Sequence, residues 1–133
     1  MKNKNIISWV LRFIVAIILI QTLYFKFTGH PESVHIFSSL GVEPYGRIIL
    51  GMIELITAIF ILIPKTKIIG MATSLGIITG AIVSHLLVLG INVDGDGGNL
   101  FMLAIIVFIC SSIFLFMHKR ELLAIIKKKI ICI

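Results

Sequence analysis

The chain has little charge, little cysteine and little proline. Of its 133 residues, only 14% are charged and 59% are hydrophobic, and the mean hydropathy is +1.14. A soluble domain carries about 25% charged residues, so this composition argues against a water-soluble enzyme, a disordered tail and a disulfide scaffold. Cys110 and Cys132 form no CxxC pair, which removes the sequence basis for a thiol–disulfide relay.

The apolar residues gather in four runs, at about residues 6–27, 46–63, 68–91 and 99–117. A membrane helix needs about 20 apolar residues, so each run is long enough, or nearly long enough, to cross a bilayer. The sequence therefore predicts an all-α fold class, an integral membrane four-helix bundle in which residues 1–133 form a single transmembrane domain. The first run is longer than the apolar part of a signal peptide and no cleavage motif follows it, so we expect it to be retained.

Basic residues lie mainly on one side of the predicted bundle. Lys2 and Lys4 precede the first span, Lys65 and Lys67 lie between the second and third, and five more lie in the basic C-terminal tail 118–133. These three segments share one side of the membrane if the chain has four spans. Loops rich in Lys and Arg stay cytoplasmic, so both termini are predicted to be cytoplasmic. The net charge of +6 then reflects topology and contact with the lipid bilayer, and no nucleic-acid partner is expected.

The segment between the first two spans carries the usual markers of a helix. Pro31 opens it, apolar residues recur at every third position from Val34 to Leu40, and Gly41 closes it. Proline at the start and glycine just past the end are typical of a helix. We predict a short interfacial helix at about residues 31–40.

The C-terminal tail has a similar pattern. Apolar residues from Leu122 to Ile133 recur at helical spacing, with lysines between them. Two structures fit this pattern. One is a basic helix that lies on anionic lipid or protrudes from the bundle, and the other is a frayed tail.

The third span contains a stripe of small residues, which are Ala72, Gly76, Gly80 and Ser84, each four positions after the last. Small residues at this spacing let another helix approach closely, so we assign the stripe to helix packing. The sequence leaves open whether the stripe packs within the chain, in a homo-oligomer or against another membrane protein.

Ionisable residues inside the spans indicate where function lies. A charged group at the centre of a membrane helix costs about 2.5–3.5 kcal/mol, so it normally faces the bundle and finds a partner. Arg47 and Glu54 share one face of the second span, and His85 lies at a depth similar to that of Glu54. Lys26 ends the first span. We predict a polar cluster in the outer half of the bundle that binds a ligand or handles protons, made of Lys26, Arg47, Glu54 and His85.

Each of these residues also has a structural interpretation. Lys26 and Arg47 reach the outer headgroups if they snorkel, and Glu54 and His85 fix the helix register if they form a structural pair. Arg12 lies nearer the cytoplasmic side. It either meets Glu54 from below or snorkels to the inner headgroups, and we assign it a structural role. No catalytic residue can be named from the sequence, so whether the chain is an enzyme stays open.

The segment 92–97, Asn-Val-Asp-Gly-Asp-Gly, resembles the start of a calcium-binding EF-hand loop. The match fails because the twelfth position is Leu103, where such a loop needs a glutamate. A tight turn before the fourth span, with Asn99 as the N-cap, is the better interpretation. His30 and His35 lie in no metal-binding motif, so no metal site is predicted.

The order of these features resembles that of the DoxX-like membrane proteins. The resemblance covers about residues 6–117 and is carried by the stretch YFKFTGHPESVHIFSSLGVEPYGRIILGMIELITAIFILIP, by SHLLVLG and by the turn DGDGGNLF. The family pattern is a Lys that ends the first span, a lone Phe before a Leu-Gly turn, a Glu within the second span and a Pro that closes it. The matching residues here are Lys26, Phe37, Leu40-Gly41, Glu54 and Pro64, followed by His85 in the third span.

The resemblance implies a multi-pass protein of the bacterial cytoplasmic (inner) membrane. The family takes its name from a small subunit linked to a quinone-reducing thiosulfate oxidation system, and other relatives are tied to methylamine utilisation, redox stress and membrane-protein assembly. Related quinone-coupled thiol oxidoreductases need a CxxC, so their chemistry does not carry over to this chain.

Two functional hypotheses follow from the residues and the resemblance together. The first is a redox- or quinone-linked accessory subunit with its polar site in the outer half of the bundle. The second is a non-catalytic partner or assembly factor for another membrane protein. No haem, flavin or iron–sulfur motif is present. No cofactor is therefore evident, and a quinone is the candidate ligand.

Overall fold

The computed structural model describes residues 2–43, 45–90 and 98–132. Over these residues the chain forms six α-helices and one π-helical segment, and no strand is present among them. The elements in chain order are α1 (Lys2–Thr28), α2 (Pro31–Ser39), α3 (Tyr45–Leu62), α4 (Lys67–Ser84), η1 (His85–Leu89), α5 (Asn99–Met117) and α6 (Lys119–Cys132).

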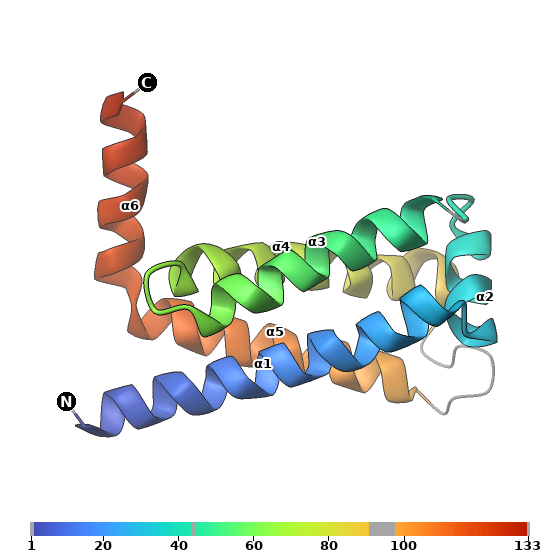
Figure 1. Cartoon of the computed structure of the whole chain (residues 1–133), viewed down its shortest axis with the longest axis horizontal. Coiled ribbons are helices and arrows are strands. Elements are labelled where there is room, and N and C mark those ends of the chain that lie inside the picture. The colour runs from blue at the N-terminus through green and yellow to red at the C-terminus, as the bar shows by residue number, and fades with distance from the viewer. Residues whose placement is uncertain (1, 44, 91–97, 133) are drawn as a thin grey trace.

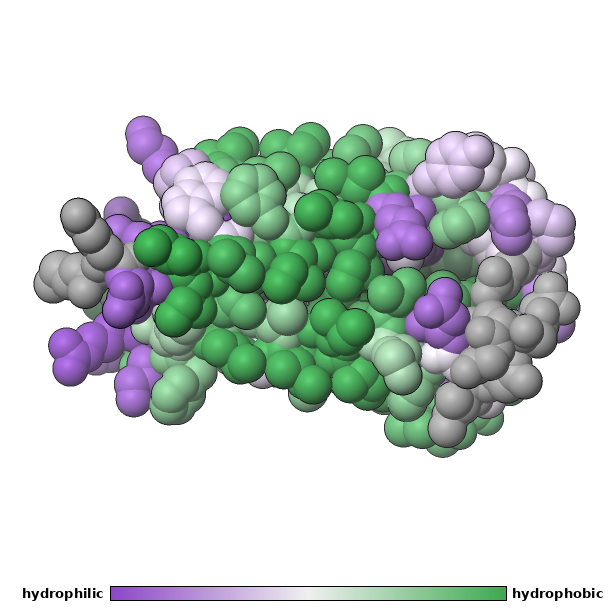
Figure 2. All heavy atoms as spheres, turned by 90° about the horizontal axis from the view of Figure 1, so that it is seen from below, coloured by the Kyte–Doolittle hydropathy of each residue, from purple (hydrophilic) through white to green (hydrophobic). Residues whose placement is uncertain are grey.

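Four of the helices are long and apolar enough to cross a membrane. The candidate spans are Asn3–Thr28, Tyr45–Leu62, Lys67–Leu89 and Asn99–Met117, so the prediction of four spans in an all-α fold is confirmed. Figure 2 shows apolar side chains around the middle of the molecule and hydrophilic ones gathered toward its two ends. This distribution matches a bilayer, in which an apolar core lies between two polar interfaces.

The four long helices form a closed ring in which α1 packs against α3, α3 against α4, α4 against α5 and α5 against α1. The short helix α2 lies across one end of this bundle, where it touches α1, α3 and η1. Both chain termini lie toward the other end, from which α6 turns away across the bundle axis (Figure 1). We call these two ends of the bundle the α2 end and the terminal end.

Glycines and prolines set the boundaries of the shorter elements. Gly29 and Gly41 flank α2 with φ of 69° and 77°, a left-handed conformation that residues with a Cβ rarely adopt. Pro31 is the first residue of α2, where its missing N–H costs nothing. The start of α5 differs from the expectation. Gly98, with φ 85°, precedes the helix and Asn99 is its first residue, so the cap is made by backbone conformation and not by an Asn99 side chain.

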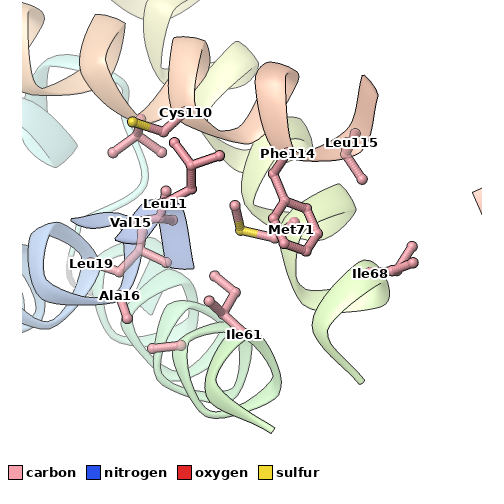
Figure 3. Close-up of a cluster of buried hydrophobic side chains, with 12 residues drawn as sticks. Leu11, Val15, Ala16, Leu19, Ile61, Ile68, Met71, Cys110, Phe114 and Leu115 are labelled. Atoms are coloured by element: carbon pink, nitrogen blue, oxygen red, sulfur yellow. The ribbon is translucent and has the colours of Figure 1, made fainter. Parts of the chain in front are cut away.

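Buried apolar side chains form a hydrophobic core (Figure 3). Its members lie on the parts of the long helices nearer the terminal end. Its fully buried members come from all four long helices and include Val15, Ile61, Met71 and Phe114. A pair of hydroxyl groups, Ser74 of α4 and Ser111 of α5, adds a buried polar contact between these helices at 3.4 Å. The interior of the bundle is therefore filled by side chains in its terminal half, so a ligand space between the four long helices must lie toward the α2 end.

Two features of the fold go beyond the sequence-based expectation. The third span does not stay α-helical to its end but continues as the π-helical segment η1, closed by a hydrogen bond from the Gly90 N–H to the His85 carbonyl at 2.7 Å. The tail is a helix, α6, and not a frayed segment. Its residues Leu122 and Ile125 pack against the core of the bundle.

Candidate functional site

A cavity of about 490 Å³ lies in the half of the bundle nearer the α2 end. Its walls come from α1, α3, α4, η1 and α5, and α2 covers one end of it with the buried side chains of Ser33 and Phe37. Most of the lining is apolar. The polar side chains on the wall are Gln21, Thr22, Lys26, Ser33, Glu54, Ser84, His85 and Asn99. A concave, mainly apolar space with a few convergent polar groups is the usual form of a small-molecule site.

The cavity wall contains a buried ion pair. The Nζ atom of Lys26 on α1 lies 3.0 Å from Oε2 of Glu54 on α3, and the two side chains are only 12% and 6% exposed. The Thr22 hydroxyl lies 3.4 Å from the same carboxylate oxygen and 2.9 Å from the Leu19 carbonyl one turn earlier, so these two acceptors share its single proton. Glu54 is thus held as an acceptor by two groups of α1. The sequence placed Lys26 and Glu54 in one cluster, and the structure brings them together.

His85 lies on another wall of the cavity, at the start of η1. Its Nδ1 is 3.0 Å from the Gly90 carbonyl oxygen, and its ring meets Phe101 edge to face at 5.5 Å between centroids. A carbonyl oxygen only accepts, so Nδ1 carries the proton in this contact. In the neutral ring, Nε2 is then left as an acceptor. Such π-helical turns occur often at functional sites.

Glu54 and His85 share the cavity without forming a direct pair. Within the described part of the chain, no hydrogen bond or ion pair joins them, since Glu54 binds Lys26 and Thr22 while His85 binds Gly90. A ligand in the cavity would therefore contact Glu54 on one wall and His85 on another.

Arg47 is not part of the cavity wall. Its Nε donates to the Glu43 carboxylate at 2.9 and 3.1 Å, and its Nη1 donates to the Lys26 carbonyl oxygen. That carbonyl belongs to the last turn of α1, where carbonyls lack helical partners. Arg47 therefore joins the end of α1 to the start of α3, and it reaches the cluster only through the backbone of Lys26.

Arg12 lies toward the terminal end, away from the cavity. Its guanidinium group donates to the carbonyl oxygens of Ile61 and Leu62 at 2.7 and 2.8 Å, and it stacks over the Trp9 ring at 3.8 Å. The residue is 2% exposed. It neither meets Glu54 nor extends toward the solvent, because the open carbonyls at the end of α3 hold it. These contacts support the structural role proposed from the sequence.

The small-residue stripe faces the cavity over much of its length. Gly76, Gly80 and Ser84 line it, and a Cβ added at Gly76 or Gly80 would meet nothing within 4 Å. Only Ala72 packs against the core. No described helix of this chain approaches the two glycines, so close packing within the chain is not found at them. Packing between chains stays a prediction.

A close helix contact lies at Gly70, which the stripe does not include. A Cβ there would lie 2.7 Å from the backbone nitrogen of Ile61, at the crossing of α3 and α4. The sequence carried a weak signal for it, because Gly70 follows soon after the Pro64 turn that brings α4 back against α3. Glycine here permits an approach that any other residue would block.

Sequence reasoning also missed the contribution of α2. The buried Ser33 and Phe37 line one end of the cavity, although Phe37 had been singled out only as part of a family pattern. Among the described residues, no group of three or more His, Cys, Asp or Glu is placed to hold a metal ion. The turn 92–97, considered for calcium, lies outside the described residues.

Comparison with known proteins identifies the family. No curated protein and no solved structure matches the chain. The DoxX-like family matches residues 10–112, which contain the second and third spans in full, most of the first and fourth, and every residue of the Lys26–Glu54–His85 cavity. The chain is a member of the DoxX-like family, with four candidate membrane spans.

Proposed function

We propose that this protein is a quinone-linked accessory subunit of a membrane redox system. The observation that carries the proposal is the buried Lys26–Glu54 ion pair, 3.0 Å apart, on the wall of a largely apolar cavity of about 490 Å³. A quinone combines an apolar ring and tail with two polar oxygens. The cavity offers the same combination, and its volume lies within the range of about 300–1,000 Å³ that is usual for small-ligand sites.

The polar groups suit the two forms of such a ligand. The Lys26 ammonium group can donate to a quinone carbonyl oxygen, and Nε2 of His85 can accept from the hydroxyl of the reduced form. Reduction of a quinone to a quinol takes two electrons and two protons. In the reverse step, oxidation of the quinol, the Glu54 carboxylate and Nε2 of the neutral His85 would each accept one proton, and a partner redox protein would accept the two electrons, since the sequence carries no haem, flavin or iron–sulfur motif. Reduction would return the same two protons from these groups and two electrons from the partner.

The membrane placement is part of the proposal. The described basic side chains at the terminal end include Lys4, Lys65, Lys67 and the basic residues of α6. Loops rich in Lys and Arg favour the cytoplasmic side. Both termini would then be cytoplasmic, and the cavity would lie in the outer half of a bacterial cytoplasmic membrane.

Quinone binding to the purified protein in neutral detergent tests the function. A short-chain quinone analogue is titrated against the wild type, Glu54→Gln and His85→Ala, with Glu121→Gln and His35→Ala as controls that make the same chemical changes outside the cavity. We expect at least about tenfold weaker binding for the two cavity variants, since one lost polar contact of about 1.4 kcal/mol changes affinity tenfold. Unchanged binding in both would remove the proposal.

The second candidate function is a non-catalytic partner or assembly factor for another membrane protein. In the most apolar stretch of the third span only 11% of the residues are buried, against 28–33% in the other three spans. This helix therefore offers a face to a neighbour. Val83 lies on that face, 45% exposed and outside the cavity. Loss of a co-purifying membrane protein in Val83→Trp, but not in Glu54→Gln, would favour this role.

A further inference from the structure

A second hollow lies at the terminal end, between α6 and the region where α3 turns into α4. It has a volume of about 390 Å³ and is lined by Lys65, Ile69, Ile125, Lys128 and Lys129. We call it the lysine groove. Three of its five residues are basic and two are apolar, and they come from two parts of the chain that are about 60 residues apart in the sequence.

The fold explains why these lysines converge. His118, 4% exposed, stacks on Phe114 at 4.2 Å between centroids and bonds the Phe114 carbonyl through Nδ1 at 2.9 Å, which fixes the chain at the end of α5. From there α6 turns across the bundle axis (Figure 1). Ile125 packs against the bundle core, and Lys128 and Lys129 follow one turn later. These contacts hold α6 in one position against the bundle, and the lysine groove lies between the two.

The lysine groove holds positive charge without a matching negative group. Lys65, Lys128 and Lys129 make no ion pair within the part of the chain that the structure describes. Glu121 lies two turns before Lys128 on α6, and its carboxylate is likewise in no ion pair there. Like charges brought together repel one another, so the groove favours an anion that bridges them.

We infer that the lysine groove binds the phosphate of an anionic phospholipid headgroup. The groove lies at the terminal end of the molecule, and Figure 2 shows that hydrophilic side chains gather at the ends, beyond the apolar middle, at the depth where headgroups lie. Ile69 in the groove lies beside the lysines, and Ile126 and Ile130 of α6 are 44% and 66% exposed. These apolar groups fit the glycerol and acyl parts of a lipid, and a free phosphate ion would leave them unused.

The test measures how many lipids the full-length protein binds, and how tightly, by native mass spectrometry from neutral detergent. Phosphatidylglycerol is the probe and phosphatidylcholine the zwitterionic control. The groove variant is Lys65→Gln/Lys128→Gln/Lys129→Gln. The matched variant Lys119→Gln/Arg120→Gln/Lys127→Gln removes the same three charges from positions of α6 outside the groove. Each basic residue near anionic lipid contributes about fivefold in affinity, so we expect at least about tenfold weaker phosphatidylglycerol binding for the groove variant and a much smaller loss for the matched one.

The variant Ile69→Gln distinguishes binding of a lipid from binding of a phosphate ion, because it keeps every lysine of the groove. It should weaken phosphatidylglycerol binding and leave competition by inorganic phosphate unchanged. Equal losses in the two triple variants would overturn the inference, because the effect would then be general surface charge. Phosphatidylcholine binding as tight as phosphatidylglycerol binding, or full competition by inorganic phosphate at equal concentration, would also overturn it. If the groove variant does not fold, Lys128→Gln against Lys127→Gln makes the same comparison with one charge.

Discussion

The ammonium group of Lys26 lies 3.0 Å from the carboxylate of Glu54, and both side chains are almost fully removed from solvent. The pair joins α1 to α3 on the wall of the cavity near the α2 end. Removing one partner of a buried pair leaves an uncompensated charge, which costs far more than the net contribution of the intact pair. Because of this asymmetry, the ion pair can be tested by stability measurements that need no ligand.

The first prediction concerns that asymmetry. Lys26→Met should lower the free energy of unfolding by about 3–5 kcal/mol, because Glu54 stays buried without its cation. Lys26→Met/Glu54→Leu should recover most of the loss, since no buried charge remains. Unfolding of the purified protein in mixed micelles measures both. A loss in the double variant equal to the sum of the losses in Lys26→Met and in Glu54→Leu alone would show that the two residues do not interact.

Arg12 leads to the second prediction. Arg12→Met leaves the carbonyls of Ile61 and Leu62 without their donors, and hydrogen bonds to a charged group are worth about 1.5–3 kcal/mol each. We expect a clear loss of stability by the same unfolding measurement, with quinone affinity unchanged because Arg12 is remote from the cavity. A variant with wild-type stability and weakened quinone binding would contradict the structural role.

The third prediction compares two glycines of α4. Gly70→Val should destabilise the protein by about 1–3 kcal/mol, because the added side chain collides with the backbone of Ile61. Gly76→Val makes the identical change where a Cβ meets nothing within 4 Å, so it should leave stability nearly unchanged. Thermal unfolding of the two variants side by side decides the matter. Equal destabilisation would mean that the α3–α4 crossing is not the close contact.

Membrane orientation supplies the fourth prediction. A fluorescent protein fused after residue 133 should fluoresce, because the basic terminal end is expected in the cytoplasm. Alkaline phosphatase fused after residue 43, at the opposite end, should be active. Inactive phosphatase together with a non-fluorescent C-terminal fusion would reverse the orientation and place the cavity in the inner half of the membrane.

Some features of the fold could be predicted from the sequence because they depend on local pattern. Four long apolar runs require four spans, and Pro31 and Gly41 bracket α2 as their backbone preferences dictate. The proximity of Lys26 and Glu54 could also be inferred, since the membrane forces charged groups to find each other. These inferences needed only helical geometry and the cost of charge in lipid.

Other features depend on how helices cross, which a single sequence does not specify. Gly76 and Gly80 have ideal packing spacing, yet they face open space, while Gly70 lies at the true contact. Arg47 shares a helical face with Glu54 but binds Glu43 and the Lys26 backbone. The turn of the third span into η1, which sets the position of His85, has no sequence pattern that we recognise.

Photolabelling with a quinone analogue that carries a photoreactive azide tests the central claim most directly, namely that the cavity holds a quinone. Mass spectrometry should find the label on cavity segments, which are residues 18–26, 76–85 and 99–107. Gly80→Phe, which fills open cavity space, should abolish the label without lowering stability. Label confined to lipid-facing side chains such as Phe13 and Phe108, at a level unchanged in Gly80→Phe, would contradict the account.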